Sequence, residues 1–93
     1  MTKEQFAKKF RAFCKKHDVE LGCTSIYSKE EWNDRGEIYG LGADFTIASE
    51  DEFLSRIEYS SNWDFQTNFH EFLESIGYWY EQGYHWSFHL YPL

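Results

Sequence analysis

Histidines and cysteines are the first residues of this 93-residue chain to consider for binding a metal or moving protons. His85 and His89 lie four positions apart in a segment that alternates polar and apolar residues, so they share one face of a predicted strand. Their Cβ atoms would then be about 13 Å apart, which is too far for both to ligate one ion. His70 adds a third candidate, but the segment that follows it, His-Glu-Phe-Leu-Glu, lacks the second histidine of a zinc-protease motif.

Cys14, His17 and Cys23 form the only other pattern with metal-ligand character. Three ligands without an evident fourth are a weak zinc signal, and the preferred interpretation is two small apolar thiols packed where a helix meets a strand. We therefore expect no metal and no cofactor. Two cysteines are too few for a disulfide framework, and residues 1–17 contain no apolar run typical of a signal peptide. A cytoplasmic protein with reduced thiols is expected.

The remaining reactive residues do not form a recognisable catalytic motif. The sequence contains no Gly-x-Ser-x-Gly nucleophile motif, no phosphate-binding loop and no dinucleotide fingerprint. The acidic run Glu50-Asp51-Glu52 is interpreted as a solvated turn or a partner contact rather than as a catalytic pair. We expect no catalytic residues and a protein that is not an enzyme.

The elements that position these residues are strongly aromatic. The chain has 20 aromatic residues, and its length predicts a single domain over residues 1–93. One apolar stripe at helical spacing predicts a helix that begins near Asp64; its members are Phe65, Phe69, Phe72, Leu73 and Ile76. This helix either ends near Gly77 or continues to Gln82, and we favour the longer version. A strand over residues 84–91 follows, with His85, His89 and Tyr91 on one face.

The first half of the chain predicts one helix and several strands. Thr2 and Gln5 form a capping box for a helix that ends near His17 and buries Phe6, Phe10 and Phe13. Alternation predicts strands over residues 19–27 and 37–47, with a polar loop at 28–35 between them. Residues 49–59 fit either a third strand, which we favour, or a short helix capped by Ser49 and Glu52.

These elements predict an α+β fold of two layers, in which two helices cover one face of an antiparallel sheet of three to four strands. The expected order is α-β-β-β-α-β. Its helix-strand-strand-strand-helix part resembles double-stranded RNA binding domains in topology alone. Those domains present lysines at the second helix, whereas residues 64–82 contain no Lys or Arg. Direct binding of nucleic acid is therefore not expected.

The net charge of −7 is unevenly distributed. Residues 1–17 contain six basic side chains and one acidic one, so residues 18–93 carry −12. An acidic body repels phosphate backbones and attracts basic protein surfaces. No apolar run approaches the ~20 residues that span a bilayer, so no membrane partner is expected.

Surplus aromatic side chains on an acidic body indicate protein binding, because Tyr and Trp anchor interfaces and carboxylates steer basic partners. We expect a stoichiometric inhibitor of phage or mobile-element type that resembles anti-CRISPR or anti-restriction proteins in class. It would act on a host defence or nucleic-acid-binding protein by placing carboxylates where phosphates bind. The candidate contacts are Trp32, Glu50, Asp51, Glu52, Trp79 and Tyr84.

Two other hypotheses remain open. The first is a small metal- or histidine-dependent enzyme that uses His70, His85 and His89. The second is a self-associating structural module in which an exposed aromatic patch forms a homodimer interface.

Overall fold

The computed structural model describes residues 1–58 and 64–93, and it has the predicted α+β class. Four strands form one antiparallel sheet in the order β1-β2-β4-β3. The strands are β1 (Ser25–Ser28), β2 (Phe45–Ala48), β3 (Tyr78–Gln82) and β4 (Ser87–Pro92). The helices in the described residues are α1 (Lys3–Lys16), α2 (Lys29–Asp34), α3 (Glu52–Glu58) and α4 (Asp64–Ser75).

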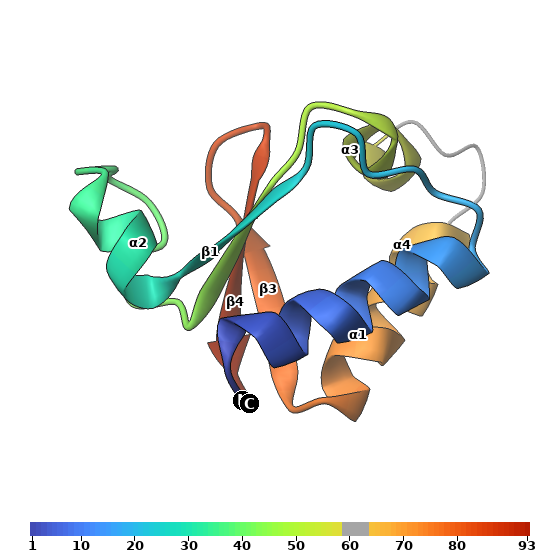
Figure 1. Ribbon diagram of the computed structural model, residues 1–93, viewed down its shortest axis with the longest axis horizontal. Coiled ribbons are helices and arrows are strands. Elements are labelled where there is room, and N and C mark those ends of the chain that lie inside the picture. The colour runs from blue at the N-terminus through green and yellow to red at the C-terminus, as the bar shows by residue number, and fades with distance from the viewer. Residues whose placement is uncertain (59–63) are drawn as a thin grey trace.

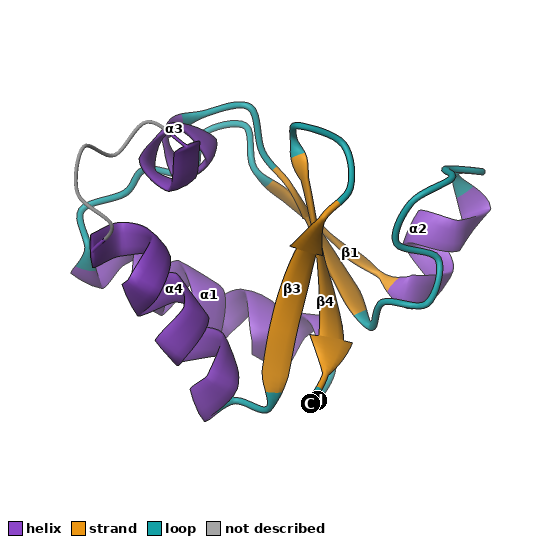
Figure 2. Ribbon diagram, turned by 180° about the vertical axis from the view of Figure 1, so that it is seen from behind, coloured by secondary structure: helices purple, strands orange, loops and turns teal. Residues whose placement is uncertain are grey.

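The two longest helices, α1 and α4, lie side by side on one face of the sheet, and α2 lies on the other side (Figures 1 and 2). Alternation along β2 and β4 sends two sets of side chains to the two faces. Phe45, Ile47, Phe88 and Leu90 belong to the main core beneath the long helices. Thr46, Ser87 and His89 are buried on the opposite face. Both faces of the central strands are therefore covered.

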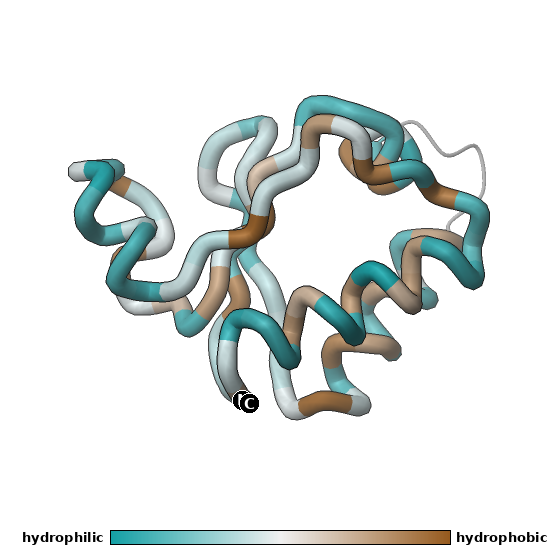
Figure 3. Tube along the Cα trace, in the orientation of Figure 1, coloured by the Kyte–Doolittle hydropathy of each residue, from teal (hydrophilic) through white to brown (hydrophobic). Residues whose placement is uncertain are grey.

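The prediction for α1 is confirmed. The Thr2 hydroxyl accepts a hydrogen bond from the Gln5 backbone N–H at 3.1 Å, and the Gln5 side chain accepts one from the Thr2 backbone N–H at 2.8 Å. Apolar and hydrophilic residues alternate along the helix in Figure 3, as expected for one buried face and one exposed face. The buried face carries Phe6, Phe10 and Phe13. The lysines of the exposed face do not enter this core.

Residues 49–59 were predicted as a strand, and this prediction is wrong over the described part of the segment because Glu52–Glu58 is helix α3. The alternative helix was correct, with one change in its cap. Asp51, rather than Ser49, accepts the hydrogen bond from the Phe53 backbone N–H. Phe53, Leu54 and Ile57 are all buried, which gives the apolar face that a short helix needs. Tyr59, the last residue of that prediction, lies outside the described residues.

Residues 28–35 were predicted as a polar loop but contain helix α2. Ser28 and Glu31 form a reciprocal capping box at its start. The long strand predicted over residues 37–47 is confirmed only at its end, because β2 begins at Phe45. Gly40 has φ +74°, and its carbonyl accepts a hydrogen bond from the Ala43 backbone N–H, so the chain turns before β2. The strand predicted over residues 19–27 is confined to Ser25–Ser28.

The helix predicted to continue to Gln82 ends at Ser75. Gly77 adopts φ +89°, a left-handed conformation that glycine tolerates and that ends helices. The five residues that follow are strand β3, which pairs with β4. The observed order is therefore α-β-α-β-α-α-β-β, and it departs from the order shared with double-stranded RNA binding domains. Among the described residues, no helix combines the length and apolar character needed to cross a membrane.

Asp51 ties the entry of α3 to residues that precede β1. Its carboxylate accepts hydrogen bonds from the Cys23 backbone N–H at 2.7 Å and from the Thr24 hydroxyl at 2.8 Å. The Ser49 hydroxyl donates a further bond at 2.7 Å. Burial acts to raise the pKa of Asp51, but these bonds favour the carboxylate more strongly and hold its pKa below the ordinary value.

Replacing Asp51→Ala is expected to lower the free energy of unfolding by about 2 kcal/mol at pH 7, because several charge-assisted hydrogen bonds are lost together. The neighbouring Glu50→Ala is the matched control, since Glu50 is exposed and should change stability by less than about 0.5 kcal/mol. Urea denaturation measures both. A depressed pKa stabilises the fold above the unfolded value of about 3.9 and loses that effect as pH falls below it. The difference between the two variants should therefore begin to shrink at about pH 4 and be lost only as pH falls through the lower folded-state pKa of Asp51. A difference that does not shrink as pH falls below about 4 would contradict this role.

Candidate protein-interaction surface

A buried histidine supports the face of the sheet that the long helices do not cover. His89 is 1 % exposed, and its Nδ1 lies 2.9 Å from the Thr46 hydroxyl. Its Nε2 lies 2.9 Å from the Ser87 hydroxyl. The ring also packs against Trp32 of α2 at a centroid distance of 5.3 Å. Both ring nitrogens are thus satisfied by hydroxyls, which can act as donor or acceptor for either tautomer.

Two glycines allow loops to pass directly over this imidazole. A Cβ at Gly40, which also has positive φ, would overlap the His89 ring. A Cβ at Gly83 would overlap both His89 and the Cβ of Tyr39. Gly40 belongs to a loop of residues 38–42, which we call the 38–42 loop. The Trp32 indole N–H donates a 2.7 Å hydrogen bond to the Tyr39 carbonyl and so holds this loop in place.

The 38–42 loop carries most of the exposed apolar side chains of this face. Ile38 is 73 % exposed, Leu41 47 % and Tyr39 46 %. The Tyr39 ring packs edge-on against Tyr84 at 4.9 Å, and Tyr84 stacks on Trp86 at 4.9 Å. At the other end of the loop, Gly42 approaches Tyr91.

Trp79 on the edge strand β3 extends this region. It faces Tyr91 across the β3 and β4 pair, with ring centroids 5.1 Å apart, and is 39 % exposed. We define the aromatic surface as the exposed or half-buried side chains Ile38, Tyr39, Leu41, Trp79, Tyr84 and Tyr91. Aromatic side chains of this kind supply large contact areas with few rotatable bonds.

Charge around the aromatic surface is predominantly negative. The segments that build it, residues 30–44 and 78–93, contain five and one carboxylate residues respectively, and Arg35 is their single Lys or Arg. Arg35 pairs with Glu37 at 3.3 Å and lies over the Tyr27 and Trp32 rings. Glu81, which occupies the position opposite His89 in the sheet register, is exposed. Two of these carboxylates are paired, since Glu31 also lies 2.9 Å from Lys3. The surface therefore combines aromatic anchors with a net negative charge.

The structure places the six candidate contact residues in different environments. Trp79 and Tyr84 belong to the aromatic surface, and Glu50 lines a nearby hollow together with Trp86 and Arg35. Trp32 is 1 % exposed and packs against the buried His89, so it is not a surface contact.

Asp51 and Glu52 make internal bonds rather than standing free. Asp51 binds the segment before β1, as described above, and Glu52 accepts a 2.9 Å hydrogen bond from the Glu20 backbone N–H. Glu52 also lies 3.7 Å from Arg56. The acidic turn was expected as a partner contact, but two of its three carboxylates hold the fold together.

The three weak metal or catalytic candidates lie in different environments. His89 is enclosed, whereas His70 stacks on Tyr80 beside α4 and His85 pairs with Glu58 at 3.1 Å. Over residues 1–58 and 64–93, no group of three or more potential metal ligands is found together.

The cysteine pattern divides in a similar way. Cys14 is buried and Cys23 is exposed. Burial, assisted by the negative charge of Asp51, raises the pKa of the Cys14 thiol to about 12. Cys14 is therefore a protonated, apolar thiol of the core, as predicted. The same prediction is wrong for Cys23, because that side chain is exposed.

Sequence reasoning missed the 38–42 loop. Tyr39 and Leu41 were assigned to the packed face of a strand because apolar residues alternate there. Gly36, Gly40 and Gly42 break up this segment, and such glycine spacing was the available signal for a loop. No protein-family model, curated protein or solved structure matches the chain.

Acidification should destabilise the protein through His89. Burial lowers the pKa of His89 below the ordinary value of about 6.5, so the folded state binds this proton less readily than the unfolded state does. The contribution of neutral His89 to the free energy of unfolding is complete above about pH 6.5 and is lost as pH falls through the folded-state pKa. NMR titration of the His89 ring should show a midpoint below about 6.5, and urea denaturation should show lower stability at pH 5.5 than at pH 7.5.

His85→Gln serves as the control because His85 is exposed. That variant should keep the same loss of stability between pH 7.5 and pH 5.5. A ring titration midpoint for His89 at or above about 6.5 would show that the buried site tolerates the imidazolium.

Proposed function

We propose that this chain is a protein-binding module that engages a basic protein partner through the aromatic surface. The observation that carries the proposal is the exposure of Ile38, Tyr39 and Leu41 on a loop that the Trp32 hydrogen bond holds in place. Exposed apolar side chains that occur singly are ordinary on protein surfaces. A contiguous set that includes aromatic residues is characteristic of binding sites.

Preorganisation supports this role. The Trp32 hydrogen bond and the close passage of Gly40 over His89 hold the 38–42 loop before any partner arrives. Binding then requires less ordering of the loop, which leaves more of the contact energy as affinity. Trp79 and Tyr84 are already packed against neighbouring rings and would behave in the same way.

Electrostatics supports a partner of positive charge. The segments that carry the aromatic surface have a net negative charge, and the exposed Glu81 lies on β3 two residues after Trp79, so a basic patch would be attracted during approach. A nucleic-acid-binding protein offers such a patch where phosphates normally bind. We propose that the chain occupies this patch stoichiometrically, as an inhibitor of phage or mobile-element type in the cytoplasm.

The first experiment is a pull-down from a bacterial lysate with matched baits. The test bait carries Ile38→Ser and Leu41→Ser, which change exposed side chains and should leave the fold intact. The control bait carries Leu93→Ser, because Leu93 is 74 % exposed and lies at the end of the chain. A protein retained by the wild type and the control but lost by the test bait supports the proposal. Equal retention by all three baits would contradict it.

The second experiment tests charge with the purified target. Glu81→Lys should weaken its binding about threefold to tenfold and flatten the dependence of affinity on salt. Glu74→Lys makes the same charge change on α4, on the other side of the sheet, and should have little effect. One equivalent of wild-type chain should also abolish nucleic-acid binding by the target. If nucleic acid and the chain bind together, the inhibitory part of the proposal fails.

A further inference from the structure

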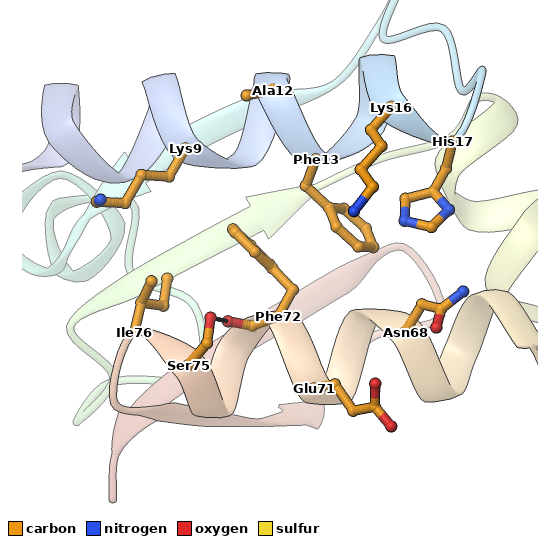
Figure 4. Close-up of a pocket in the computed structure, with 10 residues that line it drawn as sticks. All are labelled: Lys9, Ala12, Phe13, Lys16, His17, Asn68, Glu71, Phe72, Ser75 and Ile76. Atoms are coloured by element: carbon orange, nitrogen blue, oxygen red, sulfur yellow. Dashed lines mark hydrogen bonds between the residues drawn. The ribbon is translucent and has the colours of Figure 1, made fainter.

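We propose a second binding site: the groove between α1 and α4 receives one amphipathic helix of a protein partner. The groove has a volume of about 550 Å³ and lies between the two helices (Figure 4). It is on the opposite side of the sheet from the aromatic surface, so this inference stands apart from the function proposed above.

Aromatic rings form the floor of the groove. Phe13 of α1 and Phe72 of α4 stack with centroids 4.7 Å apart and lie between the two helices in Figure 4. His17 packs on Phe13 at 4.6 Å near one end, and Ile76 lines the other end. An apolar strip of this kind fits the i, i+3, i+4 and i+7 side chains of a helix.

The two banks of the groove carry opposite charges. Lys9 and Lys16 line the α1 side and form no ion pair with any residue in the described part of the chain. They are seven residues apart, which is about 10 Å or two helical turns. Glu71 lines the α4 side, and α4 contains no Lys or Arg.

This charge pattern selects the occupant. A helix with acidic residues along one flank of its apolar stripe and basic residues along the other can pair with both banks at once. A phosphate backbone would meet the lysines but would be repelled by Glu71 and the other carboxylates of α4. Two turns of contact are also sufficient for three or four anchoring side chains.

The probe is a fluorescein-labelled synthetic peptide of about 16 residues, long enough for several helical turns. It carries leucines at i, i+3, i+4 and i+7, glutamates on one flank and lysines on the other. Fluorescence anisotropy with the full chain measures its Kd. A peptide of the same composition with the leucines dispersed is the control for general charge attraction.

The test variant is Lys9→Glu with Lys16→Glu, and the matched control is Arg11→Glu with Lys15→Glu. Both pairs lie on α1 and change the net charge equally, but Arg11 and Lys15 do not line the groove. The test variant should weaken the peptide about tenfold and the control by less than about threefold. Circular dichroism should show that both variants are folded. Equal weakening by the two variants would show a diffuse basic face and overturn the proposal.

Two other occupants have their own readouts. A fluorescent single-stranded oligonucleotide that binds more tightly than the peptide, and depends on Arg11 and Lys15, would identify α1 as a phosphate-binding face instead. A dimer seen by sedimentation that the test variant abolishes and the control retains would identify a second copy as the occupant. Ile38→Ser with Leu41→Ser should leave peptide binding unchanged, so failure here is distinguishable from failure of the aromatic surface.

Discussion

The packing of Phe53 is the interaction on which the main core depends. Its ring is fully buried and makes edge contacts with Phe10 of α1 at 5.1 Å and with Phe88 of β4 at 5.3 Å. It also contacts Phe65 and Phe69 of α4 at 6.0 and 5.1 Å. One residue of a short helix therefore joins both long helices to the sheet. The hydrogen bonds that Asp51 accepts fix the start of that helix, and so the aromatic core and the polar turn beside it depend on each other.

Sequence patterns predicted the helices that can be recognised from their own residues alone. The long helices α1 and α4 each have an apolar stripe of 3.6-residue period, which no neighbouring element is needed to recognise. Helix α2 has only Trp32 on its buried side, so it has no period, and its capping box was the one readable signal. Tyr80 lies four residues after Ile76 and therefore appeared to continue the helix. Gly77 ends the helix before it, because its positive φ turns the chain into β3.

The sequence indicated which kinds of residue form the candidate site better than it indicated where they lie. Aromatic and acidic composition indicated an interface, and both Trp79 and Tyr84 lie on the aromatic surface. The position of the 38–42 loop could not be predicted, because it depends on His89, almost 50 residues away in the sequence. Alternation of apolar residues also cannot by itself distinguish a strand from a loop. The separation of a basic helix from an acidic body was visible in the sequence. The division of one groove into a lysine bank and a glutamate bank required the pairing of α1 with α4.

The close passage of Gly40 and Gly83 over His89 limits the mutations that the chain can accept during evolution. Any side chain at position 40 or 83 would occupy space that the imidazole fills. A smaller residue at position 89 would release that space but leave the Thr46 and Ser87 hydroxyls without their shared partner. Positions 40, 83 and 89 are therefore linked, and mutations there should be accepted in combination rather than singly. Ile38 and Leu41 carry no such restriction, so the aromatic surface that we propose for binding can diversify while the residues that support it stay the same.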